Sequence, residues 1–201
     1  MQRSQGIVAA AVAATLIALP AAAQFNPLSI IKGAVEAVVE DRSADKIATD
    51  TRIKTEITAE VLDKMAGEVI SISADVYEQD VMLTGAVETA AVKAKAAKPA
   101  GAVKGVKKTY NEIMVVKPVD KKKGTVEGFV DDTVIDQKIN ALLLDAGGVN
   151  VTNFRWRIVQ GNVFLFGRAL SGAERDKAVG IVKEIKGVAS VTNRAKVKPK
   201  G

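Results

Sequence analysis

The sequence predicts an α+β protein built from two tandem copies of one small module. Residues 50–115 reappear without a gap as residues 132–197, at a constant offset of 82. Each copy carries the same order of patterns, namely helix, two-stranded hairpin, helix and strand. We therefore expect two αββαβ modules, each a mixed three-stranded sheet packed on two helices.

Three motifs recur in both copies and in the same order. They are Asp-x2-Ile-x3-Ile (Asp50, Ile53, Ile57; Asp132, Ile135, Ile139), Val-x-Leu-x-Gly (Val81, Leu83, Gly85; Val163, Leu165, Gly167) and Gly-Val-x4-Asn (Gly105, Val106, Asn111; Gly187, Val188, Asn193). A repeat of this length indicates one structural unit used twice, and it implies no single catalytic centre.

The second copy has the clearer periodicity. Apolar residues at helical spacing predict a helix over 132–144, which Asp131 or Asp132 can cap. Strict alternation over 154–158 and the apolar run 163–166 predict a hairpin. A capping-box pattern at Ser171 and Glu174 begins the second helix, and residues 188–197 form the last strand.

The first copy follows the same order with one difference. Its hairpin is expected over residues 70–86, with a turn at 78–80. Pro99 stands where the second copy has Ile181. Because proline lacks the amide hydrogen and clashes with the preceding turn, we expect a kink or break near residues 97–101.

The start of the chain has the pattern of a cleaved export signal. Arg3 precedes an apolar run over 6–19, Pro20 interrupts it, and Ala21 to Ala23 give a small-residue cleavage pattern before Gln24. The expected organisation is a signal peptide (1–23), an N-terminal arm or helix (24–44), a first module (45–116), a linker (117–129) and a second module (130–198).

The composition argues against catalysis. The chain has no cysteine and no histidine, so the commonest general base, the commonest metal ligand and a thiol nucleophile are all missing. Asp131, Asp132 and Asp136 form a carboxylate cluster that is expected to cap a helix and to favour its dipole, because no loop with calcium-binding spacing follows. We expect no enzyme activity, no cofactor and no metal.

Positive charge is concentrated in one part of the chain. The net charge is +6, and between residues 91 and 123 ten lysines face only Glu112 and Asp120. Such a block favours an anionic surface, and in an exported protein phospholipid head groups come before nucleic acid. A solvated lysine-rich helix and linker is the alternative interpretation.

The repeated motifs resemble the BON domain, named for bacterial osmotically inducible and nodulation proteins. The resemblance covers about residues 45–198 in two copies. It implies an exported protein like one of two kinds in the family. One is an outer-membrane lipoprotein that binds anionic phospholipid and supports envelope integrity, and the other is a soluble periplasmic protein induced by osmotic stress. The chain lacks the acylated cysteine of the first kind.

The resemblance also implies lipid contact by the first helix of the second module. There Val134, Lys138, Ala141 and Leu142 share a flank that differs from the Ile135 core stripe. An apolar flank with a lysine can lie in a head-group layer, and the neighbouring lysines Lys121, Lys122 and Lys123 would add charge. Alternatively, Val134 and Leu142 widen the core stripe or contact the other module.

A second candidate surface lies on the hairpin of the second module. Phe164 and Phe166 are expected to point away from the helices, either as an exposed patch or, as we favour, in contact with the other module. Arg155, Arg157 and Arg168 can lie on the same face, where they either meet an acidic partner or are solvated.

Two hypotheses about function follow. The first is a non-enzymatic periplasmic protein, peripheral at the outer membrane, that binds anionic phospholipid and supports envelope integrity. The second is a soluble chaperone or adaptor of the osmotic-stress type that binds an outer-membrane or periplasmic protein through a sheet face or edge. The lysine block favours the first.

Overall fold

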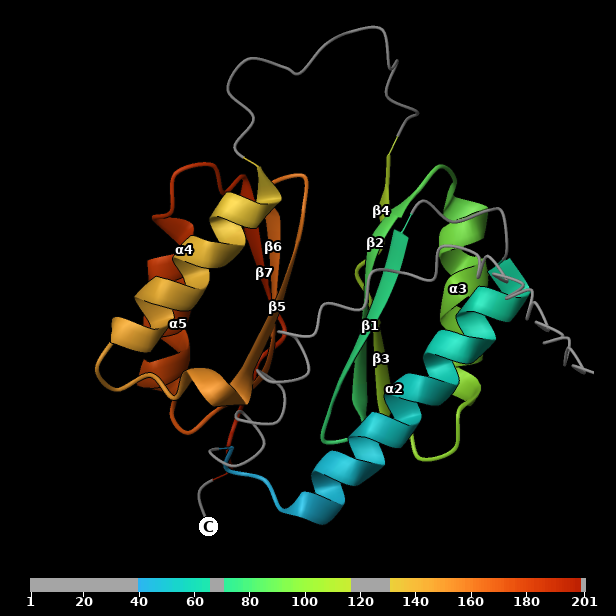
Figure 1. Ribbon diagram of the computed structural model, residues 1–201, viewed down its shortest axis with the longest axis horizontal. Helices are drawn as coiled ribbons and strands as arrows, with labels where there is room; N and C mark the ends of the chain where they lie inside the picture. The colour runs from blue at the N-terminus through green and yellow to red at the C-terminus, as the bar shows by residue number, and fades with distance from the viewer. Residues whose placement is uncertain (1–39, 66–70, 117–130, 200–201) are drawn as a thin grey trace, which may run out of the picture.

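The computed structural model describes residues 40–65, 71–116 and 131–199. In these parts each repeat forms one sheet that carries two helices on one face. The two sheets face each other, and the helices lie on the two outer sides, so that the molecule has four layers (Figure 1). The expected signal peptide, the linker 117–129 and most of the arm 24–44 lie outside the described residues.

The first module begins with a long helix. Its elements are α2 (Ala44–Met65), β1 (Ser71–Tyr77), β2 (Asp80–Val87), α3 (Ala90–Ala102), β3 (Lys108–Asn111) and β4 (Met114–Val115). Strand β2 is central: β1 pairs with it in antiparallel fashion, and β3 and β4 pair with it in parallel.

The second module repeats this order. Its elements are α4 (Asp132–Asp145), a short 3₁₀ helix (Val151–Asn153), β5 (Phe154–Val159), β6 (Asn162–Ala169), α5 (Gly172–Lys183), β7 (Ser190–Asn193) and β8 (Lys196–Val197). Strand β6 pairs with β5, β7 and β8 as β2 does with its neighbours. The predicted α+β class with two αββαβ modules is confirmed.

The third strand of each sheet is interrupted, and the asparagine of the Gly-Val-x4-Asn motif lies at the interruption. The side-chain oxygen of Asn193 accepts a hydrogen bond from the backbone N–H of Ala195 at 2.9 Å, and Asn111 does the same for Ile113 at 3.4 Å. This local turn directs Ile113 and Ala195 into the two cores, where both are buried.

Each core lies between a sheet and its own helices. In the second module, Ile135, Ile139 and Leu143 of α4 are fully buried against Val163 and Leu165 of β6. Ile53, Ile57 and Val61 of α2 take the equivalent places in the first module. The Ile-x3-Ile motif is therefore a core stripe at helical spacing.

In the second module, the glycine of the Val-x-Leu-x-Gly motif allows β6 to approach the end of the 3₁₀ helix that precedes β5. Gly167 has a φ of 108°, and a Cβ built on it would lie 2.2 Å from the backbone oxygen of Asn153. Its counterpart Gly85 also has a positive φ, of 131°. Only glycine fits such a position without displacement of the neighbouring strand.

Of the kink or break expected at Pro99, the break is wrong, because α3 continues from Ala90 to Ala102 with Pro99 inside it. The ring of Pro99 is buried next to Ala96 and Ala100, which belong to the core of the first module. The side chain of Thr89 also caps the helix by accepting a hydrogen bond from Val92 N–H. We attribute the continuity to this packing, which offsets the lost backbone hydrogen bond.

Candidate functional site

The flank of α4 that the sequence singled out lies on the outside of the molecule. Val134 and Leu142 are 40% and 45% exposed, and Lys138 and Ala141 are exposed between them. The core stripe of the same helix is fully buried, so one apolar row of α4 packs inside the module and the other faces outward. α4 covers the outer side of the second module, away from the other sheet (Figure 1).

The equivalent flank of α2 in the first module is charged. Arg52 and Glu60 occupy the positions of Val134 and Leu142, and Glu56 occupies that of Lys138. Arg52 pairs with Glu56 at 2.6 Å and donates a hydrogen bond to the backbone oxygen of Lys104 at 2.9 Å. The two helices thus share a core stripe and differ in what they expose.

Two further residues of this outer surface were not singled out in the sequence. Leu144 is 63% exposed, more than any other large hydrophobic residue among those described, and Asp145 is exposed at the end of the helix. By helical geometry Asp145 falls on the flank of Val134 and Lys138. We call Val134, Lys138, Ala141, Leu142, Leu144 and Asp145 the outer flank of α4.

A second apolar cluster lies between the modules. Phe164 and Phe166 of β6 are 5% and 2% exposed, and they pack with Tyr77 and Met82 of the first module. Tyr110 of β3 meets Phe166 edge-to-face, with ring centroids 6.1 Å apart. The helix-free faces of the two sheets therefore cover each other.

The strand arginines of the second module meet carboxylates of the first. Arg157 holds Asp75 through two hydrogen bonds of 2.7 Å, and the attraction of Asp75 raises the pKa of Arg157. Arg168 pairs with Glu78 at 2.6 Å and with Asp41 at 3.1 Å. The acidic partner of these arginines is the other half of the same chain.

Residues just before α2 complete this interface, although no sequence pattern predicted their role. The carboxylate of Glu40 pairs with both Arg155 and Arg42, and its side chain is almost fully buried. The Arg42 guanidinium lies 3.9 Å from the centre of the Tyr77 ring. No sequence spacing connects Glu40 with Arg155, so only the density of charge at Glu40, Asp41 and Arg42 could have signalled this segment.

Burial also changes the chemistry of Tyr77. Its hydroxyl donates a hydrogen bond of 3.4 Å to the side-chain oxygen of the fully buried Asn153. Desolvation raises the pKa of Tyr77 to about 12, although the positive charge of Arg42 acts in the opposite direction. The phenol is therefore held neutral in the folded protein.

The carboxylates of the Asp131 cluster are each engaged in a separate structural contact. Asp131 caps α4 by accepting from Thr133 N–H at 2.8 Å, and this hydrogen bond lowers the pKa of Asp131. Asp132 accepts from two backbone N–H groups of the β5–β6 turn, and Asp136 accepts from the indole N–H of Trp156 at 2.7 Å. Among the described residues no cluster of acids could hold a metal ion.

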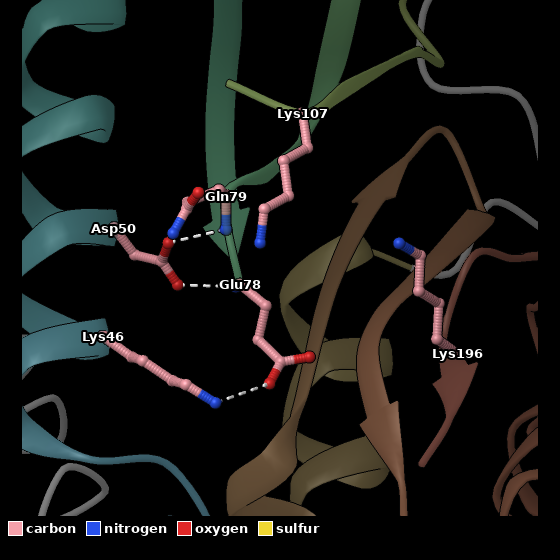
Figure 2. A pocket seen from close by; sticks show the side chains of 6 residues that line it. All are labelled: Lys46, Asp50, Glu78, Gln79, Lys107 and Lys196. Atoms are coloured by element: carbon pink, nitrogen blue, oxygen red, sulfur yellow. Dashed lines mark hydrogen bonds and ion pairs between the residues drawn. The ribbon is translucent and has the colours of Figure 1, made fainter. Parts of the chain in front are cut away.

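A cavity of about 210 Å³ lies at the turn between β1 and β2. It is lined by Lys46, Asp50, Glu78, Gln79, Lys107 and Lys196, and Figure 2 shows Lys107 and Lys196 entering from different modules. Asp50 accepts from Glu78 N–H at 2.6 Å and from Gln79 N–H at 2.8 Å. Both carboxylates of the cavity are thus already bonded within the protein, which suits a structural role.

The buried position of Asp50 affects its titration. Desolvation is the main effect and raises the pKa of Asp50, while the turn N–H groups and Arg42 act against it. Its counterpart Asp132 makes the same two backbone contacts in the second module. The first residue of the Asp-x2-Ile-x3-Ile motif therefore joins a helix to the hairpin turn.

No helix within the described ranges is long and apolar enough to cross a membrane. The geometry defines a duplicated α+β module whose two copies pack together through sheet faces that combine an apolar cluster with ion pairs. The model of the BON domain family matches residues 49–117 and 131–199, and the chain belongs to this family.

Two proteins are similar in sequence over most of their length. Osmotically-inducible protein Y of Escherichia coli is 32% identical over 161 residues, which are 79% of this chain and 79% of that protein. An uncharacterized protein of the gshII 5′ region of Anaplasma centrale is 34% identical over 128 residues, covering 64% and 82% of the two chains.

Among solved structures, CdsD, a structural protein of the type III secretion system of Chlamydia trachomatis, aligns with a TM-score of 0.34 and 12% identity. The alignment covers 73% of this chain and 92% of that one.

Proposed function

We propose that this BON protein acts without catalysis in the periplasm and contacts anionic phospholipid peripherally through the outer flank of α4. One observation carries the proposal. The two first helices have the same buried stripe, yet α4 exposes Val134 and Leu142 where α2 carries Arg52 and Glu60. An exposed apolar row outside the buried core of its own module favours a surface that binds something outside the protein.

The size of the flank predicts weak and reversible binding. Complete burial of a valine or leucine side chain is worth roughly 1.5–3 kcal/mol, and a half-exposed side chain has only part of this left to gain. Each lysine near an anionic surface adds about 1 kcal/mol. Lys138 is placed on the flank, whereas Lys121, Lys122 and Lys123 lie outside the described residues. Apolar contact and basic charge would act together, as in other peripheral proteins.

The test transfers the charged residues of the α2 flank to the equivalent positions of α4. The double variant Val134→Arg/Leu142→Glu gives α4 the residues of α2, and it should lose most of its sedimentation with phosphatidylglycerol vesicles. Glu60→Asp on α2 keeps the charge of the equivalent position and should bind like the parent. Parent-like binding by the double variant would overturn the proposal.

Charge and apolar contact can be separated in the same assay. Neutralising Lys121, Lys122, Lys123 and Lys138 should remove the part of the binding that falls as added salt screens charges. Val134→Ser/Leu142→Ser should remove a part that salt leaves unchanged, because apolar burial is not screened. Vesicles of phosphatidylcholine alone should bind only through the second part.

Similarity to osmotically-inducible protein Y supports a second candidate, an adaptor or chaperone of the osmotic-stress type. The two helix-free sheet faces cover each other, so the partner would dock elsewhere, and the outer flank of α4 is an exposed apolar surface among the described residues. A photo-crosslinking residue at position 134 distinguishes the candidates in cells: lipid adducts support the first and a protein adduct supports the second.

The proposed compartment has a direct test. If residues 1–23 are removed on export, intact-mass measurement of periplasmic material should give a chain that starts at Gln24. A full-length product in the membrane fraction would contradict export by a cleaved signal.

A further inference from the structure

Two ion pairs between the modules join residues that occupy the same position in the repeat. Asp75 and Arg157 are 82 residues apart, and so are Glu112 and Arg194, whose closest atoms lie 2.7 Å apart. The offset of the repeat is also 82. A residue can meet its own counterpart only near a twofold axis, so the modules are paired as an isologous dimer would be.

The contacts of whole strands have the same symmetry. β1 lies against β6 and β2 lies against β5, and each of these contacts is the counterpart of the other. In an isologous interface every contact of this kind occurs twice. The chain thus resembles two subunits of a symmetric dimer joined in one polypeptide.

The charges do not follow this twofold symmetry, because the first face supplies the acids and the second face supplies the bases. The acid belongs to residues 40–112 and the base to the second module in each of the pairs Glu40–Arg155, Asp41–Arg168, Asp41–Lys198, Asp75–Arg157, Glu78–Arg168, Asp80–Lys196 and Glu112–Arg194. Two copies of the first face would bring Asp75 against Asp75, and two copies of the second would bring Arg157 against Arg157. Juxtaposed like charges disfavour such pairs.

We propose that Asp75, Arg157, Glu112 and Arg194 determine which faces pair: a first-module face accepts a second-module face and rejects a copy of itself. The rule holds whether the second-module face belongs to the same chain or to another copy of it. In the parent protein the covalent connection gives the intrachain face a high effective concentration, so the closed monomer prevails. This inference is independent of the proposed lipid contact.

The test uses two full-length charge variants. Asp75→Arg places two arginines at the contact between positions 75 and 157, which we call the central contact. Arg157→Asp places two aspartates there. When the variants are mixed, the arginine at position 75 of one chain can pair with the aspartate at position 157 of the other, and the remaining two faces also match. The expected product is an exchanged dimer with twice the mass of either variant, measured by light scattering after size exclusion or by native mass spectrometry.

The double variant Asp75→Arg/Arg157→Asp restores the match within one chain. It should be a monomer like the parent, while each single variant should melt lower by at least about 4 °C, since 1 kcal/mol corresponds to roughly 2–4 °C in a chain of this size. Fluorescence of Trp156, the single tryptophan, reports whether the second module is folded. The pair Glu112→Arg and Arg194→Glu provides an independent set, used if either variant at the first site does not fold.

Several outcomes would overturn the proposal. Folded single variants that give no dimer when mixed would show that the faces do not select each other in trans. A single variant that melts like the parent would show that the central pair is indifferent to charge. A double variant that remains as unstable as the single ones would assign the loss to contacts within each module, such as the Lys54–Asp75 ion pair, and not to the match between the two faces.

Discussion

The carboxylate of Asp132 accepts a hydrogen bond from the backbone N–H of Gly161 at 2.7 Å, which ties the first turn of α4 to the β5–β6 turn. The N–H of Gln160 donates to the same carboxylate at 2.8 Å. Both turn residues have positive φ, 52° at Gln160 and 75° at Gly161. A turn of this type leaves its N–H groups unpaired within the hairpin, and the aspartate satisfies them.

Asp132→Ala should lower the free energy of unfolding by about 1–3 kcal/mol, because two backbone donors lose their acceptor. Asp50→Ala should cost more, since it also leaves Arg42 buried beside Glu40 with one carboxylate fewer. Urea unfolding of the two variants measures both values. Equal losses would contradict the role given to the Arg42 pair.

Gly167→Ala should destabilise the protein by roughly 2–4 kcal/mol, because the new methyl group would collide with the backbone oxygen of Asn153 at 2.2 Å and the positive φ disfavours alanine. Gly180→Ala is the matched control, since Gly180 lies inside α5 with nothing near its Cβ position. It should stabilise by about 0.5–1 kcal/mol through helix propensity. Thermal melting of both variants shows whether the signs differ.

Tyr77 should titrate near pH 12 in the folded protein, above the usual value of 10. In the Tyr110→Phe variant it is the only tyrosine, so tyrosinate absorbance reports it alone. Since the folded state holds the phenol neutral, its contribution to stability is complete below pH 10 and is lost as the pH rises towards 12. A titration midpoint near 10 with the fold intact would contradict burial of this ring between the modules.

Asp145→Asn should strengthen binding to phosphatidylglycerol vesicles, because it removes the one acidic side chain of the outer flank and leaves Lys138 as its only charge. Loss of a repulsion comparable to one lysine contact, about 1 kcal/mol, corresponds to a gain of roughly fivefold in affinity. Vesicle sedimentation at low salt measures it. The effect should disappear on phosphatidylcholine vesicles, and a similar gain there would contradict an electrostatic origin.

The repeat and the apolar periodicities were sufficient to predict both modules, because these signals are local in the chain. The helix caps could also be predicted, since capping at Asp131 and Ser171 follows from local helix geometry. Glu174 departs from the simple capping box: its carboxylate accepts from the N–H groups of Leu170 and Asn150. That second partner lies 24 residues away, beyond any local pattern.

The outcome at Pro99 shows the limit of local propensity, since the cost of an interior proline was known and the buried face that offsets it was not. The acidic partners of Arg155, Arg157 and Arg168 lie 82 to 127 residues earlier in the chain. No spacing rule connects such distant charges. The relative placement of the modules decides these pairs, and the sequence does not encode that placement in a periodicity.

The layered arrangement has a consequence for orientation. The helices α2 and α4 lie on opposite outer sides, separated by both sheets (Figure 1). A bilayer that receives α4 would therefore leave the charged flank of α2 directed into the aqueous compartment. Because the two modules are packed together, the second module would contact the bilayer and hold the first module away from it. The α2 side of the first module would then always face the aqueous compartment.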